Sequence, residues 1–203
     1  MLLEKPDRKR GFAKERIIRV LLNFDSGEVT KYRVAKEAET SEAWTREYTS
    51  KLEERGLLND TEVLEPRKLY EEWQRVRIEP NKLDVALQQP EKLLRETELD
   101  YATTTYAAEN AHQGFLFDSR TDFYVHPDQI EDWLKIVEEK GMIGGGNTRL
   151  LATERQVFYE EAPVPHLYTG SVSPLNADPL DEGWAWEDAV VKHIDKVHGG
   201  AQW

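Results

Sequence analysis

The side chains best suited to bind a ligand lie between Ser41 and Gly56, in a run of sequence with no internal glycine or proline. If this run is a helix, Arg46 and Ser50 share one face and Lys51 lies at its flank, because residues three and four apart stack on a helix surface. Arginine can donate two hydrogen bonds to guanine, and lysine and serine can bind base edges or phosphate oxygens. This pattern therefore predicts a helix that reads the major groove of DNA.

Other residues extend this predicted DNA contact. Glu47 could accept a hydrogen bond from a cytosine amino group or orient a neighbouring arginine. The aromatic side chains are expected to abut the DNA backbone, and the N-terminal basic residues to contact phosphate or the adjacent minor groove. The predicted DNA-binding set is Arg8, Lys9, Arg10, Tyr32, Ser41, Trp44, Arg46, Glu47, Ser50 and Lys51. The alternative reading of the same pattern is an ordinary helical hairpin with a solvated charged face.

Two short helices joined by a tight turn would position these side chains. Thr30 is a suitable N-cap for a first helix from about Lys31 to Ala38, and Ser41 for a second from Glu42 to Arg55. Gly56, which is free to adopt a positive φ, ends the second helix. Together these features predict a helix-turn-helix.

Three more elements are expected around this pair. They are a helix from Phe12 or Ala13 to Asn23, a hairpin that turns at residues 59–61, and a helix that begins at Pro66. The apolar positions of all five elements form one set: Ile17, Ile18, Leu21, Leu22, Val34, Ala35, Leu52, Leu57, Val63, Leu69 and Trp73. This set predicts a small domain over residues 15–78, preceded by a basic mobile arm over residues 1–14.

Residues 82–198 predict a mixed α/β domain, separated from the first domain near Pro80, with a tail at 199–203. Three helices are expected: from Lys82 to Leu94, bent or broken at Pro90, from Tyr101 to His112, and from Pro127 to a stop at Gly141. The expected strands lie at residues 114–117, 123–125, 149–152, 156–159 and 167–172, before a last helix at 184–197.

Charge is distributed unevenly along the chain. The net charge is −12, but residues 1–80 contain 17 Lys or Arg and 17 Asp or Glu, whereas residues 81–203 contain 10 and 22. A basic arm on a neutral helix-turn-helix is compatible with DNA binding, and an acidic second domain would limit non-specific binding.

Several other kinds of site are not expected. The chain has no cysteine, and its five histidines are scattered, so no metal site and no cofactor is predicted. A run of at least 18 apolar residues is absent, which places the expected protein in the cytoplasm rather than in a membrane. Residues 144–147 predict a hairpin turn rather than a phosphate loop. Gly170-Ser171 with Asp178 and Asp181 could hold magnesium as in nucleotidyltransferases, but these acids lie in a proline-containing loop.

Two resemblances sharpen the prediction. The segment 52–58, LEERGLL, resembles the L-E-x-x-G-L-[LIV] end of the recognition helix in winged-helix regulators, and residues 34–38 resemble the helix before it. In that family a hairpin wing follows, which implies that residues 59–61 form its turn. The chain departs from the family pattern at Thr45, Glu47 and Thr49.

The second resemblance covers residues 15–198. Tyr101-Ala102, Ala107-Ala108, the run Val172-Ser173-Pro174-Leu175 and Asp188-Ala189 resemble the AbiEi-like antitoxins of type IV toxin–antitoxin systems. Membership would imply an N-terminal winged helix that represses its own promoter and a C-terminal α/β domain. After Pro174 the sequence differs from the family pattern, so the residues by which that family contacts its partner are not assigned in this sequence.

The expected fold is therefore α+β, with an N-terminal winged helix-turn-helix domain followed by a mixed α/β domain. The expected function is transcription regulation by binding double-stranded DNA, without catalysis. The second domain would bind a partner, such as a toxin-like nucleotidyltransferase, or form a homodimer. The alternatives are a protein–protein adaptor whose winged helix does not bind DNA and a nucleotidyltransferase-like enzyme.

Overall fold

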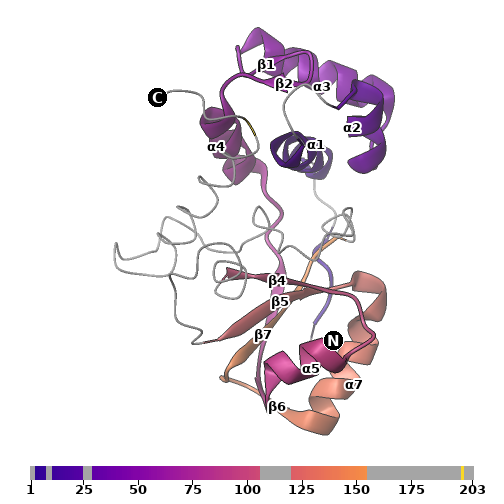
Figure 1. The fold of residues 1–203 in the computed structure, drawn as a ribbon. Coiled ribbons are helices and arrows are strands. Elements are labelled where there is room, and N and C mark those ends of the chain that lie inside the picture. Colours follow the sequence, from indigo (N-terminus) through magenta and orange to yellow (C-terminus); the bar gives the residue numbers. More distant parts are fainter. Residues whose placement is uncertain (1–2, 8–10, 25–28, 106–119, 155–197, 199–203) are drawn as a thin grey trace. The chain divides into compact units, whose positions relative to one another are not determined.

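The protein has an α+β fold whose described residues divide into two compact units (Figure 1). This computed structural model describes residues 3–7, 11–24, 29–105, 120–154 and 198. We call residues 11–24 and 29–78, with His198, the helical unit. Residues 3–7, 79–105 and 120–154 are the sheet unit.

The helical unit contains four helices and a short hairpin. Their bounds are α1 Phe12–Asn23, α2 Lys31–Glu37, α3 Glu42–Glu54, β1 Leu58–Asn59, β2 Glu62–Val63 and α4 Pro66–Val76. These elements agree with the sequence expectation to within one residue at most of their ends, because each has a local start or stop signal. All eleven apolar residues predicted to form the core are buried.

Local capping sets the limits of the two central helices. Thr30 accepts a hydrogen bond from the backbone N–H of Arg33 at 3.2 Å, and Ser41 accepts one from Trp44 at 3.2 Å. Each bond satisfies one of the free N–H groups of a first helical turn. Gly56 follows α3 with φ of 71°, a conformation that glycine adopts without steric cost.

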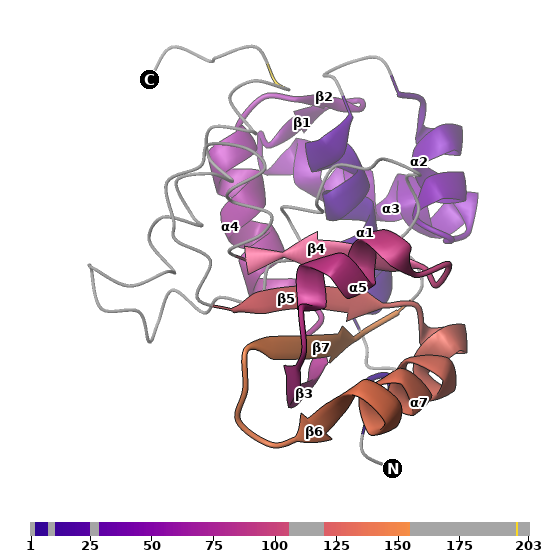
Figure 2. The ribbon, with the colours of Figure 1, turned by 60° about the horizontal axis from the view of Figure 1, so that its bottom comes forward.

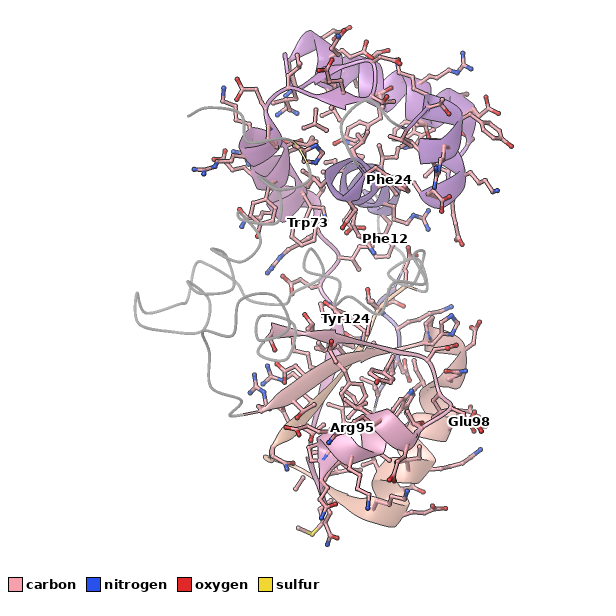
Figure 3. All side chains as sticks on the ribbon, viewed as in Figure 1. Phe12, Phe24, Trp73, Arg95, Glu98 and Tyr124 are labelled. Carbon is pink, nitrogen blue, oxygen red and sulfur yellow. The ribbon has the colours of Figure 1, made fainter. Side chains whose placement is uncertain are left out.

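The α1 helix packs on α4 around a buried polar contact. Glu15 and Arg19 of α1 are both buried, and Arg19 Nε donates to Glu15 Oε1 at 2.9 Å. The indole N–H of Trp73, on α4, donates to the same carboxylate at 2.8 Å. Figure 3 shows the Trp73 ring pointing from α4 towards α1. His198 also contacts this unit, with its Nε2 3.0 Å from the carbonyl oxygen of Leu22, although the sequence assigned it to the end of the second domain.

The sheet unit is built on one mixed sheet. Its elements are β3 Asn81–Leu87, α5 Pro90–Glu96, β4 Tyr101–Thr104, β5 Thr121–Val125, a 3-10 turn Pro127–Gln129, α7 Ile130–Lys140, β6 Gly141–Ile143 and β7 Thr148–Ala152. The strand order is β4-β5-β7-β3-β6, in which β5 and β7 are parallel and the other pairs antiparallel.

Alternate residues of the strands form two apolar clusters on opposite faces of the sheet. Both helices, α5 and α7, contribute to the larger cluster (Figure 2). Its buried members include Leu83, Val85, Leu87, Leu93, Leu94, Phe123, Val125, Ile130, Trp133, Val137 and Leu150. The other face carries Ala102, Tyr124 and Leu151.

The N-terminal residues do not form one arm over 1–14. Leu3 is buried in the larger cluster of the sheet unit, and the side-chain amide of Asn81 donates to the carbonyl oxygen of Glu4 at 2.9 Å. Phe12 already begins α1. The mobile arm was predicted from the high density of charged residues in this segment. That prediction gave no weight to Leu3, whose burial anchors the segment to the sheet unit.

Two helices expected in the second domain are wrong over their first residues. Residues 81–87 form β3, whose inward residues Leu83, Val85 and Leu87 alternate with more exposed ones, and only residues 90–96 are helical. Residues 101–104 form β4, since Thr103 and Thr104 are β-branched and pair with β5. The strands expected at 123–125 and 149–152 and the helix after Pro127 are confirmed. The rest of the helix expected up to His112, from residue 106 on, and the segments 114–117, 156–159, 167–172 and 184–197 lie outside the described residues.

Candidate nucleic-acid interface

Helix α3 has one buried side and one continuous exposed side. Thr45, Tyr48, Thr49 and Leu52 are buried. The exposed positions follow one another at steps of one and three residues: Glu42, Ala43, Arg46, Glu47, Ser50, Lys51 and Glu54. Because this spacing matches the helical repeat, all seven residues share a face that a long, narrow ligand could cover. We call these seven residues the α3 face.

Contacts at its two ends hold α3 in place. The hydroxyls of Thr40 and Thr45 are hydrogen-bonded at 2.7 Å across the turn between α2 and α3. Arg55, which follows α3, donates to Glu72 of α4 at 3.0 Å. Ser41, expected to contact DNA, uses its hydroxyl as the N-cap of α3. The α3 face is therefore presented by a helix that is fixed at both ends.

Each cation on the α3 face is paired with a glutamate of the same helix. Arg46 Nη2 lies 3.6 Å from Glu42 Oε2, and Lys51 Nζ lies 2.6 Å from Glu47 Oε1. Exposed pairs at this spacing are worth about 0.3–0.5 kcal/mol each, because solvent screens them. A phosphate or a guanine can therefore displace either glutamate at small cost.

Trp44 lies at the edge of the α3 face. Its side chain is half-buried, and the ammonium of Lys51 lies 5.9 Å from the centre of its ring. Within the described residues its indole N–H is buried without a hydrogen-bond partner. The ring thus supports Lys51 rather than projecting fully into solvent.

Helix α2 exposes a second set of polar side chains. Tyr32, which is 62% exposed, shares its side of α2 with Arg33 and Lys36. The Arg33 guanidinium lies 4.7 Å from the centre of the Phe24 ring and pairs with Glu37 at 3.8 Å. The sequence analysis overlooked Arg33 and Lys36 as candidates, although their positions one and four residues after Tyr32 are a sufficient signal.

Lys31 links three elements of the helical unit. Its ammonium lies 2.7 Å from Glu53 of α3 and 3.0 Å from Asp60, in the turn between β1 and β2. The hydrogen bond to Glu53 raises the pKa of Lys31, and partial burial opposes this effect. This residue was not predicted, because its partners are more than twenty positions away in the sequence.

Two groups of predicted residues cannot be placed. Arg8, Lys9 and Arg10 lie outside the described residues, and so do Gly170, Ser171, Asp178 and Asp181. The structure therefore brings together Ser41, Trp44, Arg46, Glu47, Ser50 and Lys51 on α3, with Tyr32 exposed on α2.

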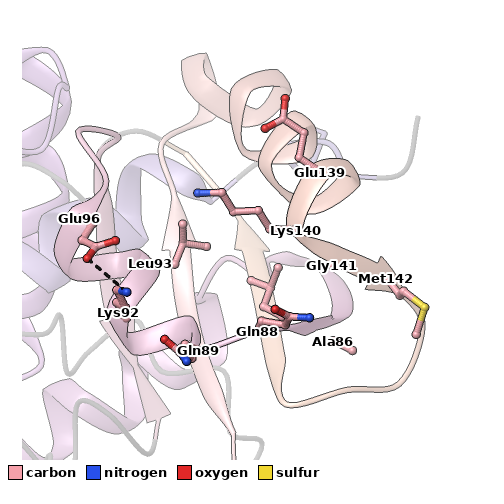
Figure 4. Close-up of a pocket in the computed structure, with 11 residues that line it drawn as sticks. Ala86, Gln88, Gln89, Lys92, Leu93, Glu96, Glu139, Lys140, Gly141 and Met142 are labelled. Atoms are coloured by element: carbon pink, nitrogen blue, oxygen red, sulfur yellow. Dashed lines mark ion pairs between the residues drawn. The ribbon is translucent and has the colours of Figure 1, made fainter.

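The sheet unit has an open groove of about 700 Å³ (Figure 4). It lies between the end of β3, helix α5 and the junction of α7 with β6. Its charged side chains are Lys92, Glu96, Glu139 and Lys140, of which Lys92 and Glu96 are paired at 3.9 Å. The residues that line it include no histidine, serine or threonine, so they supply no hydroxyl nucleophile with an imidazole base.

Two further observations concern the described residues alone. They contain no group of three or more histidine, aspartate or glutamate side chains placed to hold a metal ion. Among their helices, none combines the length and the apolar character needed to cross a lipid bilayer.

Comparisons of the chain with protein families, with curated proteins and with solved structures gave no match.

Proposed function

We propose that this protein is a winged-helix transcription regulator that binds double-stranded DNA in a sequence-specific manner. Helix α3 enters the major groove, and the β1–β2 hairpin is the wing. The observation that carries the proposal is the α3 face, a continuous exposed polar surface on a helix fixed by an N-cap and by contacts to α2 and α4. A recognition helix needs this separation of a buried stripe from short polar and basic side chains.

Three side chains of α3 make the proposed contacts to bases and to the phosphates next to them. Arg46 binds a base edge, and Ser50 and Lys51 bind a base edge or the phosphate next to it. On α2, Tyr32 and Lys36 contact the backbone of the DNA. Lys31 keeps the wing close to α3, since it bridges Glu53 and Asp60.

The test compares two arginines in the full-length protein. Binding sites are first selected from a random duplex library, and affinity is then measured for the selected site and for unrelated DNA. Arg46→Ala should weaken specific binding by about 1–3 kcal/mol and leave non-specific binding nearly unchanged. Arg75→Ala is the matched control, because Arg75 on α4 is equally exposed at 68% and pairs with a glutamate at 3.5 Å. Specific binding of the control should not change.

Two results would contradict the proposal. Equal losses for Arg46→Ala on both DNAs would exclude base readout by α3. Failure to select any site, together with no complex at low salt, would exclude DNA binding altogether, since phosphate contacts are strongest there.

A more specific form of the proposal is that the protein is an AbiEi-like antitoxin and autorepressor. It rests on the sequence resemblance, with the C-terminal domain binding a toxin-like nucleotidyltransferase or a second copy. The test is to express the chain with the genes beside its own and to ask whether a nucleotidyltransferase co-purifies and whether the protein binds its own promoter. If neither occurs, this form fails while general DNA binding can still stand.

A protein–protein adaptor is the second candidate. The pairing of Arg46 and Lys51 with glutamates of their own helix favours it, because the α3 face carries no excess of positive charge. An adaptor would form no DNA complex even at low salt, whereas a regulator that neutralises several phosphates would lose affinity steeply as salt rises.

A further inference from the structure

A cluster of charged side chains surrounds Tyr48 on the buried side of α3. It comprises Lys14 in the first turn of α1, Arg55 after α3, and Glu72 and Arg75 on α4. Arg55 Nη2 and Arg75 Nη1 contact the same oxygen of Glu72, Oε2, at 3.0 and 3.5 Å. Three cations and one carboxylate give the cluster a net charge of +2. We call these five residues the Tyr48 cluster.

The hydroxyl of Tyr48 is a buried donor. Tyr48 is only 4% exposed, and within the described residues its hydroxyl has no hydrogen-bond partner. Buried hydroxyls in folded proteins nearly always form a hydrogen bond, so this one is a candidate to donate to a ligand. Burial, with a further contribution from Glu72, raises the pKa of Tyr48 to about 12. The hydroxyl therefore keeps its proton at neutral pH and can donate it to an anion.

Lys14 supplies a cation beside this hydroxyl. Its ammonium lies 5.6 Å from the centre of the Tyr48 ring and forms no ion pair in the part of the chain that the structure describes. Hydrogen bonding from Arg55 is the main cause that lowers the pKa of Glu72, and the charge of Lys14 adds to it, which places Lys14 near that carboxylate. Lys14 is half-buried and Arg55 is exposed, so an anion can reach both from solvent.

We propose that Lys14, Tyr48 and Arg55 bind the phosphate group of a small molecule. The ammonium and the guanidinium donate charge-assisted hydrogen bonds to the phosphate oxygens, and the Tyr48 hydroxyl donates a third bond. A phosphate group carries about −1.5 to −2 charges at neutral pH, which matches the net charge of the Tyr48 cluster. Glu72 keeps Arg75 as a partner when Arg55 turns to the phosphate.

The position of Tyr48 separates this site from the proposed DNA contact. Tyr48 lies with Thr45, Thr49 and Leu52 on the buried side of α3, not on the α3 face. A phosphate at its hydroxyl is held by α1, α3 and α4 behind that face, which suits a free ligand rather than DNA. Because the ligand would link three helices, its binding should stabilise the helical unit whether or not DNA is present.

The test measures thermal unfolding of the full-length protein, without DNA, in sodium phosphate and in sodium chloride of the same ionic strength. Phosphate should raise Tm more than chloride does, and titration calorimetry with inorganic phosphate should give a saturable binding curve. Phosphate also stabilises proteins because it is excluded from their surface, so the comparison between variants carries the test.

Two variants remove one donor each. Tyr48→Phe should be at least as stable as the wild type in chloride at neutral pH, because the hydroxyl has no partner to lose, and should bind phosphate about tenfold more weakly. Lys14→Gln should weaken phosphate binding by a similar factor. Lys68→Gln is the matched control, since Lys68 on α4 is 63% exposed and pairs with Glu65 outside the Tyr48 cluster. Phosphate binding of the control should not change.

Three results would overturn the proposal. An equal gain in Tm from phosphate for the wild type and Tyr48→Phe would mean that the hydroxyl does not contact the ligand. A loss of affinity in Lys68→Gln as large as in Lys14→Gln would indicate screening of the overall charge rather than a site. A wild type that binds no phosphate would also exclude the site, and weaker DNA binding of Tyr48→Phe and Lys14→Gln would then assign these residues to the DNA contact. Because DNA is absent from the phosphate measurements, they are independent of the proposed regulation.

Discussion

Two glutamate–arginine pairs in the helical unit have the same spacing and opposite surroundings. Glu15 and Arg19 on α1 are four residues apart and buried, with Trp73 bonded to the same carboxylate. Glu42 and Arg46 on α3 are also four residues apart, but both are exposed. Water screens the exposed pair, so its glutamate can be displaced by a ligand. The buried pair has no such freedom, because breaking it leaves a charge with no solvent around it.

Because one ion pair is buried and the other is exposed, the two have different roles. The pair on α1 belongs to the packing of α1 against α4, and the pair on α3 lies on the surface proposed to bind DNA. Sequence spacing alone cannot separate these roles, because both pairs read as helical i, i+4 contacts.

The largest expected effect on the free energy of unfolding comes from a substitution of Glu15. Glu15→Ala should destabilise the protein by about 3–5 kcal/mol, because it leaves the Arg19 guanidinium and the Trp73 N–H buried without their partner. Glu42→Ala is the exposed counterpart and should cost less than about 0.5 kcal/mol. Urea unfolding followed by circular dichroism measures both. Similar losses for the two variants would mean that burial does not distinguish the pairs.

A double variant sharpens the same comparison. Glu15→Leu with Arg19→Met removes both charges and should be more stable than Glu15→Ala, because no buried charge remains unpaired. Its stability should stay below that of the wild type, since the Trp73 N–H still lacks an acceptor. A double variant no more stable than Glu15→Ala would show that lost packing, rather than an unpaired charge, causes the destabilisation.

The next effect is a loss of stability at high pH that originates on the buried side of α3. Burial, with Glu72 nearby, raises the pKa of Tyr48 to about 12. A pKa raised in the folded state gives stability that is present below pH 10 and lost as pH rises from about 10 towards 12. The loss should be about 1–2 kcal/mol after allowance for solvent. Alkaline unfolding of the wild type and of Tyr48→Phe, which should lack this component, measures it.

A smaller loss of folding stability is expected at low pH. Hydrogen bonding from Arg55 lowers the pKa of Glu72, with further support from Arg75. A lowered pKa means that the stabilisation is present above the ordinary pKa of a glutamate and is lost as pH falls through the folded value. This partly exposed link should contribute about 0.5–1 kcal/mol. Glu72→Gln should remove that part of the acid dependence, and an unchanged acid profile would show that the link is not stabilising.

The smallest change concerns the α3 face itself. Glu47→Gln removes the carboxylate that holds Lys51 at 2.6 Å, so stability should fall by no more than about 0.5 kcal/mol. DNA binding at low salt should become modestly stronger, because Lys51 no longer has to break its ion pair with the Glu47 carboxylate before it binds a phosphate. Gel shifts over a salt series measure this. Weaker specific binding in this variant would instead indicate that Glu47 itself contacts a base.

The elements of the helical unit could be predicted from the sequence because their signals are local. Thr30 and Ser41 are followed by helices, Gly56 ends one, and Pro66 begins another. The buried side of α3 followed from the helical repeat, which also placed Arg46 and Ser50 on the opposite side. A cap or a turn acts over three or four residues, so one stretch of sequence contains the whole signal.

Other features depend on residues that only the tertiary structure brings together. Strand β3 was predicted as helix because its pairing partners, β6 and β7, lie some sixty residues away, and pairing and burial outweigh weak local preferences. Lys31 has its partners at Glu53 and Asp60 for the same reason. Which residues of β6 pair with which residues of β3 depends on the register of the two strands, and the three residues of β6 do not specify that register by themselves. The sequence by itself determined where the helices of the first unit begin and which face of α3 is polar, because those properties are local. Which ion pairs are buried and which sheet edge is open was decided by contacts between distant segments.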